Sequence, residues 1–253
     1  MVEQEGMSFF PTTLRCVSIG ELLTEGKYSG KSSILSLLLR LIEPVPSDTP
    51  TVTDALRSSI SIDGIPLNSI DHTILRDRVF SASQDAVFLP DGSSFRSNLD
   101  PWGSSTIAEC LSILHDLDLQ ALVEAKGGLE APASFSELSA GQKQLFSLAR
   151  LLLRRLVKIR ESGVDGGLLL LDEITSSADA ETERRVRRLL EVEFEKYTVV
   201  MVTHHREMAV ACDRAVVLDS GRVVENGEPG KLLERESGWF RGLWETGERS
   251  KDA

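Results

Sequence analysis

A glycine, a lysine and two serines at residues 30–33 have the side chains and spacing that suit the binding of an anion. Lys31 carries a point charge, and the hydroxyl of Ser32 can ligate Mg²⁺. The apolar stretch that begins here predicts a helix, whose first backbone N–H groups can bind a phosphate. Gly30, Lys31, Ser32 and Ser33 therefore form a candidate phosphate site, with a surface turn formed by chance as the competing interpretation.

Two acidic residues, Asp172 and Glu173, directly follow the continuous apolar run Leu168–Leu171. Such a run is typical of a strand that is covered on both faces. Ligands of α/β folds bind at the carboxyl ends of strands. Asp172 can then hold Mg²⁺ through water, and Glu173 can polarise a water that attacks a phosphate. Solvated carboxylates at a strand end are the competing interpretation.

His204 occupies a similar position, because it follows an apolar strand predicted over residues 198–203. A neutral imidazole at a strand end can contact the terminal phosphate of a nucleotide. An ordinary polar histidine in a loop is the competing interpretation.

The elements that must position these residues alternate between strand and helix. An apolar run over residues 32–42 predicts a buried helix that ends before Pro44 and Pro46. Residues 96–160 are predicted to be mainly helical, and a further helix is predicted over residues 180–196. Strands are predicted over residues 13–19, 59–64, 78–82, 168–171, 198–202 and 215–218. This alternation indicates an α/β fold with a mostly parallel sheet.

Two further features complete the predicted elements. Basic residues lie toward the end of the helix that Gly163 interrupts, where cations complement the helix dipole. They are Arg150, Arg154, Arg155, Lys158 and Arg160. From Lys231 onward we expect a peripheral helix and a charged tail.

The composition excludes several classes of protein. Lys plus Arg number 28 against 39 Asp plus Glu, and the resulting net charge of −11 argues against a nucleic-acid partner. Only 6% of the residues are aromatic, too few for a platform that stacks bases. Cys16, Cys110 and Cys212 lack metal-ligand spacing and fit a reducing cytosol better than a disulfide scaffold. No stretch reaches the roughly 20 apolar residues of a membrane helix, so we expect no direct membrane spanning by this chain.

Together with the run LSAGQ at Leu138–Gln142, these residues resemble the nucleotide-binding domain of ATP-binding cassette (ABC) transporters, whose signature reads LSGGQ. The resemblance covers about residues 30–230 and keeps the order of the motifs. It implies a single ABC-type domain over residues 1–253 with a P-loop NTPase fold. The implied parts are a RecA-like core at about 13–95 and 165–230, an inserted helical subdomain at about 96–160, and a tail at 231–253.

The resemblance also assigns roles to individual residues. Glu173 corresponds to the catalytic glutamate and His204 to the switch histidine. The implied nucleotide-binding residues are Gly26, Ser29, Gly30, Lys31, Ser32, Ser33, Gln84, Ser139, Gly141, Gln142 and Asp179. The implied ligands of Mg²⁺ are Ser32, Gln84 of the Q-loop, and Asp172 of the Walker B motif. In the family, the signature residues face the γ-phosphate that is bound by the opposite domain of a head-to-tail dimer.

Two segments resemble a particular subfamily, and a third segment departs from the family's sequence pattern. Residues 92–102 are similar to the second ATPase domain of C-subfamily exporters, and residues 158–167 look like fungal members of that group. The family's phosphate loop reads GxxGxGK[ST], whereas residues 25–32 read EGKYSGKS. Tyr28 replaces a glycine, which implies strain on the order of 1–3 kcal/mol and reduced ATPase activity. Residues 1–29 are otherwise atypical, and neither Phe9 nor Phe10 matches the aromatic that stacks on adenine.

The leading prediction is an ATP-hydrolysing motor domain of an ABC exporter, with ATP and Mg²⁺ as cofactors. Its partners would be a second nucleotide-binding domain and transmembrane domains, which would hold it at the cytoplasmic face of a membrane. A degenerate regulatory domain that completes its partner's site is the alternative. A third class, the ABC ATPases of translation or DNA repair, fits less well because of the acidic charge and residues 92–102.

Overall fold

The computed structural model describes residues 16–21, 30–43 and 60–243, with the backbone alone for the first range. The chain divides into two compact units, which are described separately. The first unit comprises Met1–Phe80, Gly166–Leu170 and Lys196–Ala253, and the second comprises Ser81–Asp165 and Leu171–Glu195. The strand start predicted at residues 13–15 and the end of the charged tail, residues 244–253, lie outside the described residues.

Most of a six-stranded sheet with the order β4-β5-β6-β1-β7-β8 belongs to the first unit, and the last two residues of β4 and of β5 belong to the second. The strands of this sheet are β1 (Cys16–Glu21), β4 (Val79–Ala82), β5 (Gly167–Asp172), β6 (Tyr197–Val202), β7 (Arg214–Asp219) and β8 (Arg222–Gly227). Strand β1 pairs in parallel with both β6 and β7, whereas β8 is antiparallel to β7. The expected α/β fold is confirmed. Strand β8 was not predicted, because its residues Arg222–Gly227 form no continuous apolar run.

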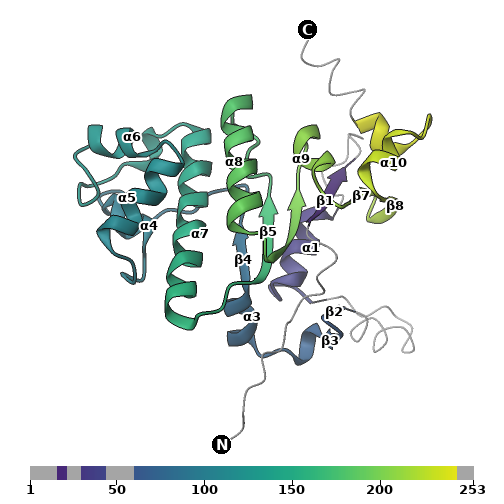
Figure 1. Cartoon of the computed structure of the whole chain (residues 1–253), viewed down its shortest axis with the longest axis horizontal. Helices are drawn as coiled ribbons and strands as arrows, with labels where there is room; N and C mark the ends of the chain where they lie inside the picture. The colour runs from purple at the N-terminus through teal and green to yellow at the C-terminus, as the bar shows by residue number, and fades with distance from the viewer. Residues whose placement is uncertain (1–15, 22–29, 44–59, 244–253) are drawn as a thin grey trace, which may run out of the picture. The chain divides into compact units, whose positions relative to one another are not determined.

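Short elements surround the sheet of the first unit (Figure 1). They are α1 (Lys31–Leu38), β2 (Ser61–Ile62), β3 (Ile65–Pro66), η1 (Leu67–Ser69), α3 (His72–Arg78), α9 (Arg206–Val210) and α10 (Pro229–Leu233). The strand predicted over residues 59–64 is confirmed in part: β2 occupies Ser61–Ile62, and the turn that ends it reverses the chain into a hairpin with β3. Asp63 and Gly64 form this turn with φ values of 52° and 76°, a conformation typical of two-residue hairpin turns.

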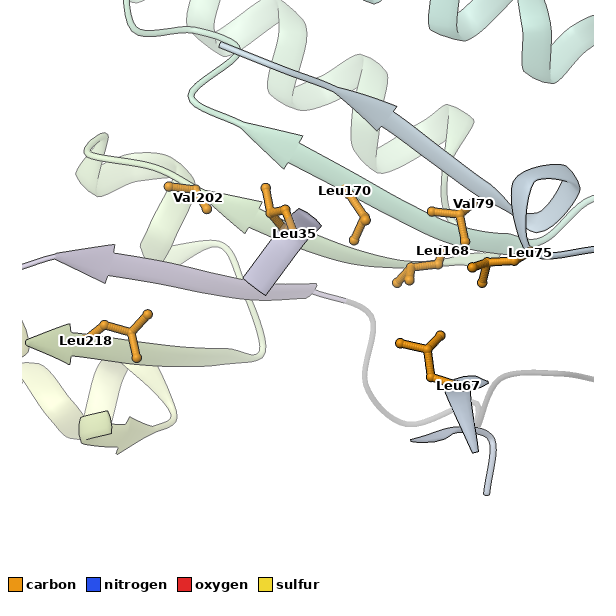
Figure 2. Close-up of a cluster of buried hydrophobic side chains, with 8 residues drawn as sticks. All are labelled: Leu35, Leu67, Leu75, Val79, Leu168, Leu170, Val202 and Leu218. Atoms are coloured by element: carbon orange, nitrogen blue, oxygen red, sulfur yellow. The ribbon is translucent and has the colours of Figure 1, made fainter. Parts of the chain in front are cut away.

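One apolar cluster holds α1 and the sheet strands together (Figure 2). Leu35 of α1 lies among side chains from the strands, so the helix is anchored through its apolar face. The buried members of the cluster are Leu35, Leu67, Leu75, Val79, Leu168, Leu170, Val202 and Leu218. Burial of apolar surface stabilises this packing. The cluster therefore holds α1, which begins at Lys31, against the sheet.

The segment after β8 is more deeply buried than a peripheral tail would be. Leu232 and Phe240 are almost completely buried and pack against strand β7. The carboxylate of Glu225, itself buried, accepts a hydrogen bond of 2.7 Å from the backbone N–H of Phe240 and one of 3.0 Å from Arg235. Residues 231–243 are therefore part of the fold of the first unit.

The second unit is mainly helical. Its elements are α4 (Phe95–Leu99), α5 (Ile107–Asp116), α6 (Gln120–Ala125), η2 (Phe135–Glu137), α7 (Ala140–Ser162) and α8 (Ala180–Glu193). Its core contains an aromatic cluster in which ring centroids lie 4.0 to 6.1 Å apart, formed by Phe88, Phe95, Phe135 and Phe146. Helix α7 ends where predicted, because Gly163 adopts a left-handed C-cap with φ 68° and donates to the carbonyl of Ile159.

The basic side chains of α7 make specific tertiary contacts, which corrects the expectation that they mainly complement the helix dipole. Arg160 is the only basic residue in the last turn. Arg155 donates to Glu193 at 2.6 Å and to Asp165 at 3.0 Å. Arg154 lies over the ring of Trp102, 5.8 Å from its centroid. These contacts connect α7 to the segments that flank it within the second unit.

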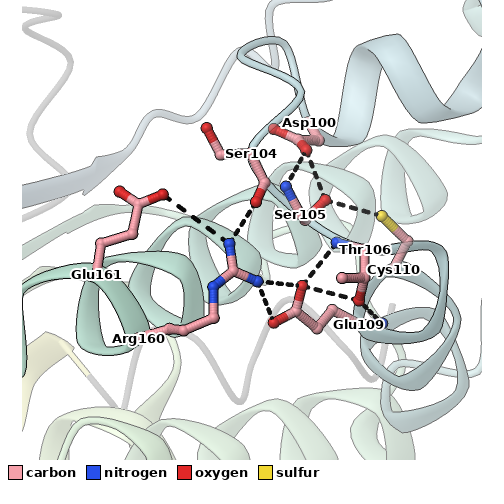
Figure 3. Close-up of polar contacts among 8 residues, drawn as sticks. All are labelled: Asp100, Ser104, Ser105, Thr106, Glu109, Cys110, Arg160 and Glu161. Carbon is pink, nitrogen blue, oxygen red and sulfur yellow. Dashed lines mark hydrogen bonds and ion pairs between the residues drawn. The ribbon is translucent and has the colours of Figure 1, made fainter.

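Arg160 also connects the end of α7 to the start of α5 (Figure 3). Its Nη1 donates to both carboxylate oxygens of Glu109, at 2.6 and 2.7 Å, and Nη2 donates to the carbonyl of Ser104. Glu109 also accepts from the N–H of Thr106, whose side chain caps α5 in return. The bond from Thr106 and the contact with Arg160 lower the pKa of Glu109.

A buried cluster of polar side chains lies beside this contact. Asp100 Oδ2 accepts from the N–H of Ser105 at 2.6 Å and from its hydroxyl at 2.5 Å, while Ser105 Oγ lies 3.2 Å from the Sγ of Cys110 (Figure 3). Cys110 is a free thiol, and burial raises its pKa. Cys212, in contrast, is disulfide-bonded, which differs from the expectation of reduced thiols.

Candidate functional site

The start of α1 has the geometry of an anion site. Gly30 precedes the helix with φ 90° and ψ 6°, and as a glycine it contributes no side-chain cap. The first N–H groups of a helix need partners from outside it, and the dipole favours a negative one. Lys31 is 9% exposed, whereas Ser32 and Ser33 are exposed. The other predicted loop residues, Gly26 and Ser29, lie outside the described residues.

His204 belongs to the same unit and follows β6. Strands β1 and β6 are parallel, with Ile19 paired to Val202, so their carboxyl ends lie at one edge of the sheet. Helix α1 follows β1 and packs on the sheet through Leu35, which brings its start back toward that edge. Between β6 and the exposed His204, the buried Thr203 accepts a hydrogen bond from the N–H of His205 at 3.0 Å. This edge is where parallel sheets bind ligands.

In the second unit, Asp172 and Glu173 occupy the predicted strand end. Asp172 is the last residue of β5, and both side chains are half-buried. Glu173 has φ 50°, a left-handed conformation that non-glycine residues rarely adopt. This value turns the chain sharply at the residue that carries the second carboxylate. Gln84 is exposed in the loop after β4, next to a turn in which Ser83 Oγ donates to the carbonyl of Asp85.

The signature residues form the N-terminus of α7. Ser139 is exposed and caps the helix: its Oγ accepts from the N–H of Gln142 at 3.1 Å, and Gln142 Oε1 accepts from the N–H of Ser139 at 3.0 Å. This capping box uses an acceptor lone pair of the serine hydroxyl, so its proton can still be donated to an anion. At Gly141, a Cβ atom would lie 2.9 Å from the carbonyl oxygen of Ser177, which explains why glycine is needed there.

Asp179 caps α8. Its carboxylate accepts from the N–H groups of Thr182 at 2.8 Å and Glu181 at 3.0 Å. The hydrogen bond from the Thr182 backbone is the largest of the causes that lower the pKa of Asp179. The carboxylate is therefore ionised at neutral pH and holds the end of the loop that starts at Glu173.

Two side chains of α7 make tertiary contacts that the sequence analysis did not predict. Gln144, in the second turn of α7, hydrogen-bonds to the loop after β5. Arg150 donates to the carbonyls of Asn98 at 2.7 Å and Val87 at 2.8 Å. A sequence signal existed for Gln144, because it shares a helix face with Leu148 and Leu151 and is polar where the pattern demands an apolar residue.

The described residues fit ATP and Mg²⁺ by their chemistry. The start of α1, with Lys31 and Ser32 in its first turn, fits a phosphate. The proposed Mg²⁺ ligands are a hydroxyl (Ser32), an amide (Gln84) and a carboxylate (Asp172), and oxygen ligands are those that Mg²⁺ prefers. No group of three or more His, Cys, Asp or Glu side chains that could hold a metal exists within residues 30–43 and 60–243. A site with one or two carboxylates suits Mg²⁺, which keeps waters and phosphate oxygens as its remaining ligands.

Within the part of the chain that the structure describes, no helix is both long and apolar enough to cross a bilayer.

Known proteins are similar to this chain in sequence. A family model described as ABC transporter matches residues 28–176. The chain is 45% identical over 224 residues to the ABC-type transporter braE of Annulohypoxylon truncatum, covering 87% of this chain and 15% of that protein. It is 46% identical over 217 residues to the ABC transporter FGM5 of Gibberella zeae, covering 85% of this chain and 14% of that protein. The chain thus spans about 15% of the length of a curated relative.

A solved structure shares the fold. A bacterial Atm1-family ABC exporter with ATP bound superposes with a TM-score of 0.74 at 24% sequence identity, over 92% of this chain and 37% of that chain. The likeness supports the P-loop NTPase fold of the ABC ATPase type, with a parallel sheet core. The chain therefore belongs to the ABC transporter family, of which it represents an ATP-binding domain.

Proposed function

We propose that this chain is the ATP-hydrolysing motor domain of an ABC exporter. ATPase domains of the ABC family bind ATP, generally with Mg²⁺, and hydrolyse it. The observation that carries the proposal is the start of α1, where Gly30 in a left-handed conformation leads directly into the helix that carries Lys31 and Ser32 in its first turn. Such a helix start at the carboxyl edge of a parallel sheet binds nucleotide phosphates.

Each predicted residue takes a role in this proposal. Gly30, Lys31, Ser32 and Ser33 bind the phosphates, together with Gly26 and Ser29 of the preceding loop. Ser32, Asp172 and Gln84 hold Mg²⁺, which supplies charge neutralisation at the phosphates. Glu173 accepts the proton of the attacking water, and His204 contacts the γ-phosphate.

The proposal includes a head-to-tail dimer with a second nucleotide-binding domain. Its support is the N-terminus of α7, which is capped by Ser139 and Gln142 and ends in exposed residues. Ser139, Gly141, Gln142 and Asp179 would face the nucleotide of the second domain, and residues 96–160 would form the helical subdomain. Transmembrane domains would hold the assembly at the cytoplasmic face of a membrane. The relatives support this arrangement, because they are named as transporters and are several times longer than this chain.

A finer assignment concerns the subfamily. The similarity of residues 92–102 to the second ATPase domain of C-subfamily exporters supports that placement. An alternative function, a regulatory domain that binds ATP without hydrolysing it, is favoured by Tyr28 in place of a loop glycine. The measurement that separates the two functions is phosphate release by the chain, alone and with a second nucleotide-binding domain.

The test of the motor function is the variant Glu173→Gln. We expect it to bind Mg-ATP with unchanged affinity, because the amide keeps the size of the side chain. We expect turnover to fall by roughly 10²- to 10⁴-fold, the usual contribution of a general base. Calorimetric titration and phosphate release measure the two quantities. Turnover close to that of the wild type would exclude Glu173 as the base.

A further inference from the structure

The loop between β5 and α8 carries the proposed base, and its conformation is unusual. Glu173 begins the loop with φ 50°. Two backbone turns follow, in which the carbonyl of Glu173 accepts from the N–H of Ser176 at 3.1 Å and the carbonyl of Thr175 accepts from that of Ala178 at 3.0 Å. A residue in a sparsely populated backbone region keeps it only where its surroundings determine the conformation. The neighbours that hold this loop therefore matter for the direction of the Glu173 carboxylate.

Gln144 of α7 is one such neighbour, and both ends of its amide are used. Its side chain is buried, with the residue 8% exposed. Nε2 donates to the hydroxyl of Ser176 at 2.7 Å and to the carbonyl of Glu173 at 3.3 Å. Oε1 accepts from the N–H of Ser177 at 3.1 Å. The reverse orientation of the amide would place a donor against the N–H of Ser177 and an acceptor against the carbonyl of Glu173.

The backbones of α7 and the loop also approach each other closely. At Gly141, one helical turn before Gln144, an added Cβ would lie only 2.9 Å from the carbonyl oxygen of Ser177. A side chain at this position would push the two segments apart. The loop is thus held against α7 by contacts at Ser176 and Ser177 and by the bond to Glu173 itself.

We propose that Gln144 is a positioning residue that fixes the backbone of the Glu173–Ser177 loop and thereby aims the Glu173 carboxylate. This inference rests on the proposed function of Glu173 as general base. Gln144 would not contact the nucleotide or the attacking water. Its role would be to hold the base in the conformation in which it can reach the water.

Two substitutions separate the hydrogen bonds from the packing. Gln144→Leu keeps the volume but removes every hydrogen bond. Gln144→Glu keeps the acceptor for Ser177 N–H, and its carboxyl recovers a donor only when it is protonated. The control is Gln120→Leu, which removes a glutamine hydrogen bond (to Glu124, 2.8 Å) from α6 of the same unit.

The first readout is amide hydrogen exchange of the full chain, which does not depend on hydrolysis. In Gln144→Leu, exchange over residues 174–178 should accelerate by at least about tenfold, because the loss of even one of the three hydrogen bonds to the loop has an effect of that size. Exchange in the interior of α7 should stay unchanged. Lowering the pH should slow loop exchange in Gln144→Glu relative to Gln144→Leu, because protonation restores the donor. Unchanged loop exchange, or faster exchange throughout α7 and α8, would overturn the proposal.

The second readout is the steady-state turnover of Mg-ATP. Gln144→Leu should lower kcat by roughly 10- to 100-fold, as expected for a displaced catalytic group, with KM within about twofold of the wild type. Gln120→Leu should change neither constant. A loosened loop with wild-type kcat, or a raised KM alone, would overturn the positioning role. A wild-type chain without turnover would contradict the proposed function instead, and exchange alone would then decide the role of Gln144.

Discussion

Gly30 is the residue on which the start of α1 most directly depends. With φ 90°, it lies in a region where a side chain is strained, yet nothing lies within 4 Å of where its Cβ would be. An alanine there would meet no neighbouring atom, so its cost would come from the backbone alone. A substitution of Gly30 by alanine therefore tests the effect of backbone conformation without a change in packing.

We predict that Gly30→Ala weakens Mg-ATP binding. Strain of about 1–2 kcal/mol in the left-handed region would lower affinity by roughly 5- to 30-fold. The matched control is Gly230→Ala in α10, where nothing lies within 4 Å of the added Cβ and φ is not positive. This control should leave affinity unchanged. Isothermal titration calorimetry of both variants measures the effect, and equal affinities for Gly30→Ala and the wild type would contradict the phosphate role of this backbone.

At the scale of elements, two helices of the second unit begin with the same motif. Ser139 and Gln142 form a capping box on α7, and Thr106 and Glu109 form one on α5. The two caps make equivalent contributions to helix stability, because each satisfies two N–H groups that have no partner within the helix. Only the first of them lies in a motif with a proposed role in catalysis.

We predict that Ser139→Ala and Thr106→Ala cost similar stability but differ in activity. Each should lower the free energy of unfolding by about 1 kcal/mol, or Tm by about 2–4 °C. Only Ser139→Ala should also lower Mg-ATP turnover in the presence of a second domain. Differential scanning calorimetry and phosphate release measure these effects. A similar loss of turnover in both variants would show that Ser139 acts only as a helix cap and has no separate role in hydrolysis.

The turn before α5 should make stability depend on pH. Burial alone would raise the pKa of Asp100, but the hydrogen bonds from Ser105, Ser104 and Gly103 outweigh it and hold the pKa below its ordinary value of 3.8. A lowered folded-state pKa means that the stabilisation is fully present above the unfolded pKa. It is lost as the pH falls through the folded pKa.

We predict that Asp100→Asn lowers stability at pH 7 and reduces the loss of stability on acidification below about pH 4. Removing hydrogen bonds to a charged acceptor should cost roughly 1.5–3 kcal/mol at pH 7. Ser105→Ala, which removes only the hydroxyl of the pair, should lie between the wild type and Asp100→Asn. Urea unfolding followed by circular dichroism at neutral and acidic pH gives these values. Parallel pH profiles for the wild type and Asp100→Asn would contradict the assignment.

For the whole molecule, local sequence patterns predicted the helices and strands better than they predicted the tertiary contacts between them. Strand β5 was predictable because Leu168–Leu171 is a continuous apolar run, and the start of α7 because Ser139 and Gln142 have capping-box spacing. Strand β8 was not predictable, because Arg222–Gly227 form no continuous apolar run. Its buried Glu225 is paired with Arg235 and with the N–H of Phe240, contacts that no local pattern shows. The role of Gln144 was equally hidden, because its partners lie about 30 residues away along the chain.

The net charge of −11 bears on how two copies could associate. Two chains that each carry this charge repel each other at long range, and a head-to-tail dimer has to overcome that repulsion. The proposed source of attraction is the γ-phosphate, bound at α1 of one copy and at the N-terminus of α7 of the other. Repulsion between exposed charges weakens with salt, because the Debye length falls to about 10 Å at 0.1 M. Because the proposed contact runs through the γ-phosphate, dimerisation should require Mg-ATP, and moderate salt should not disrupt it.

We predict that Glu173→Gln with Mg-ATP sediments as a dimer, whereas without nucleotide it sediments as the 27.8 kDa monomer. The variant should accumulate the dimer because the nucleotide that bridges the two copies is not hydrolysed. Adding Ser139→Arg in the same background should restore the monomer, since a bulky side chain at the start of α7 blocks the second contact with the phosphate. The same double variant should keep its affinity for Mg-ATP as a monomer. Loss of that affinity would show that α7 binds the nucleotide of its own chain.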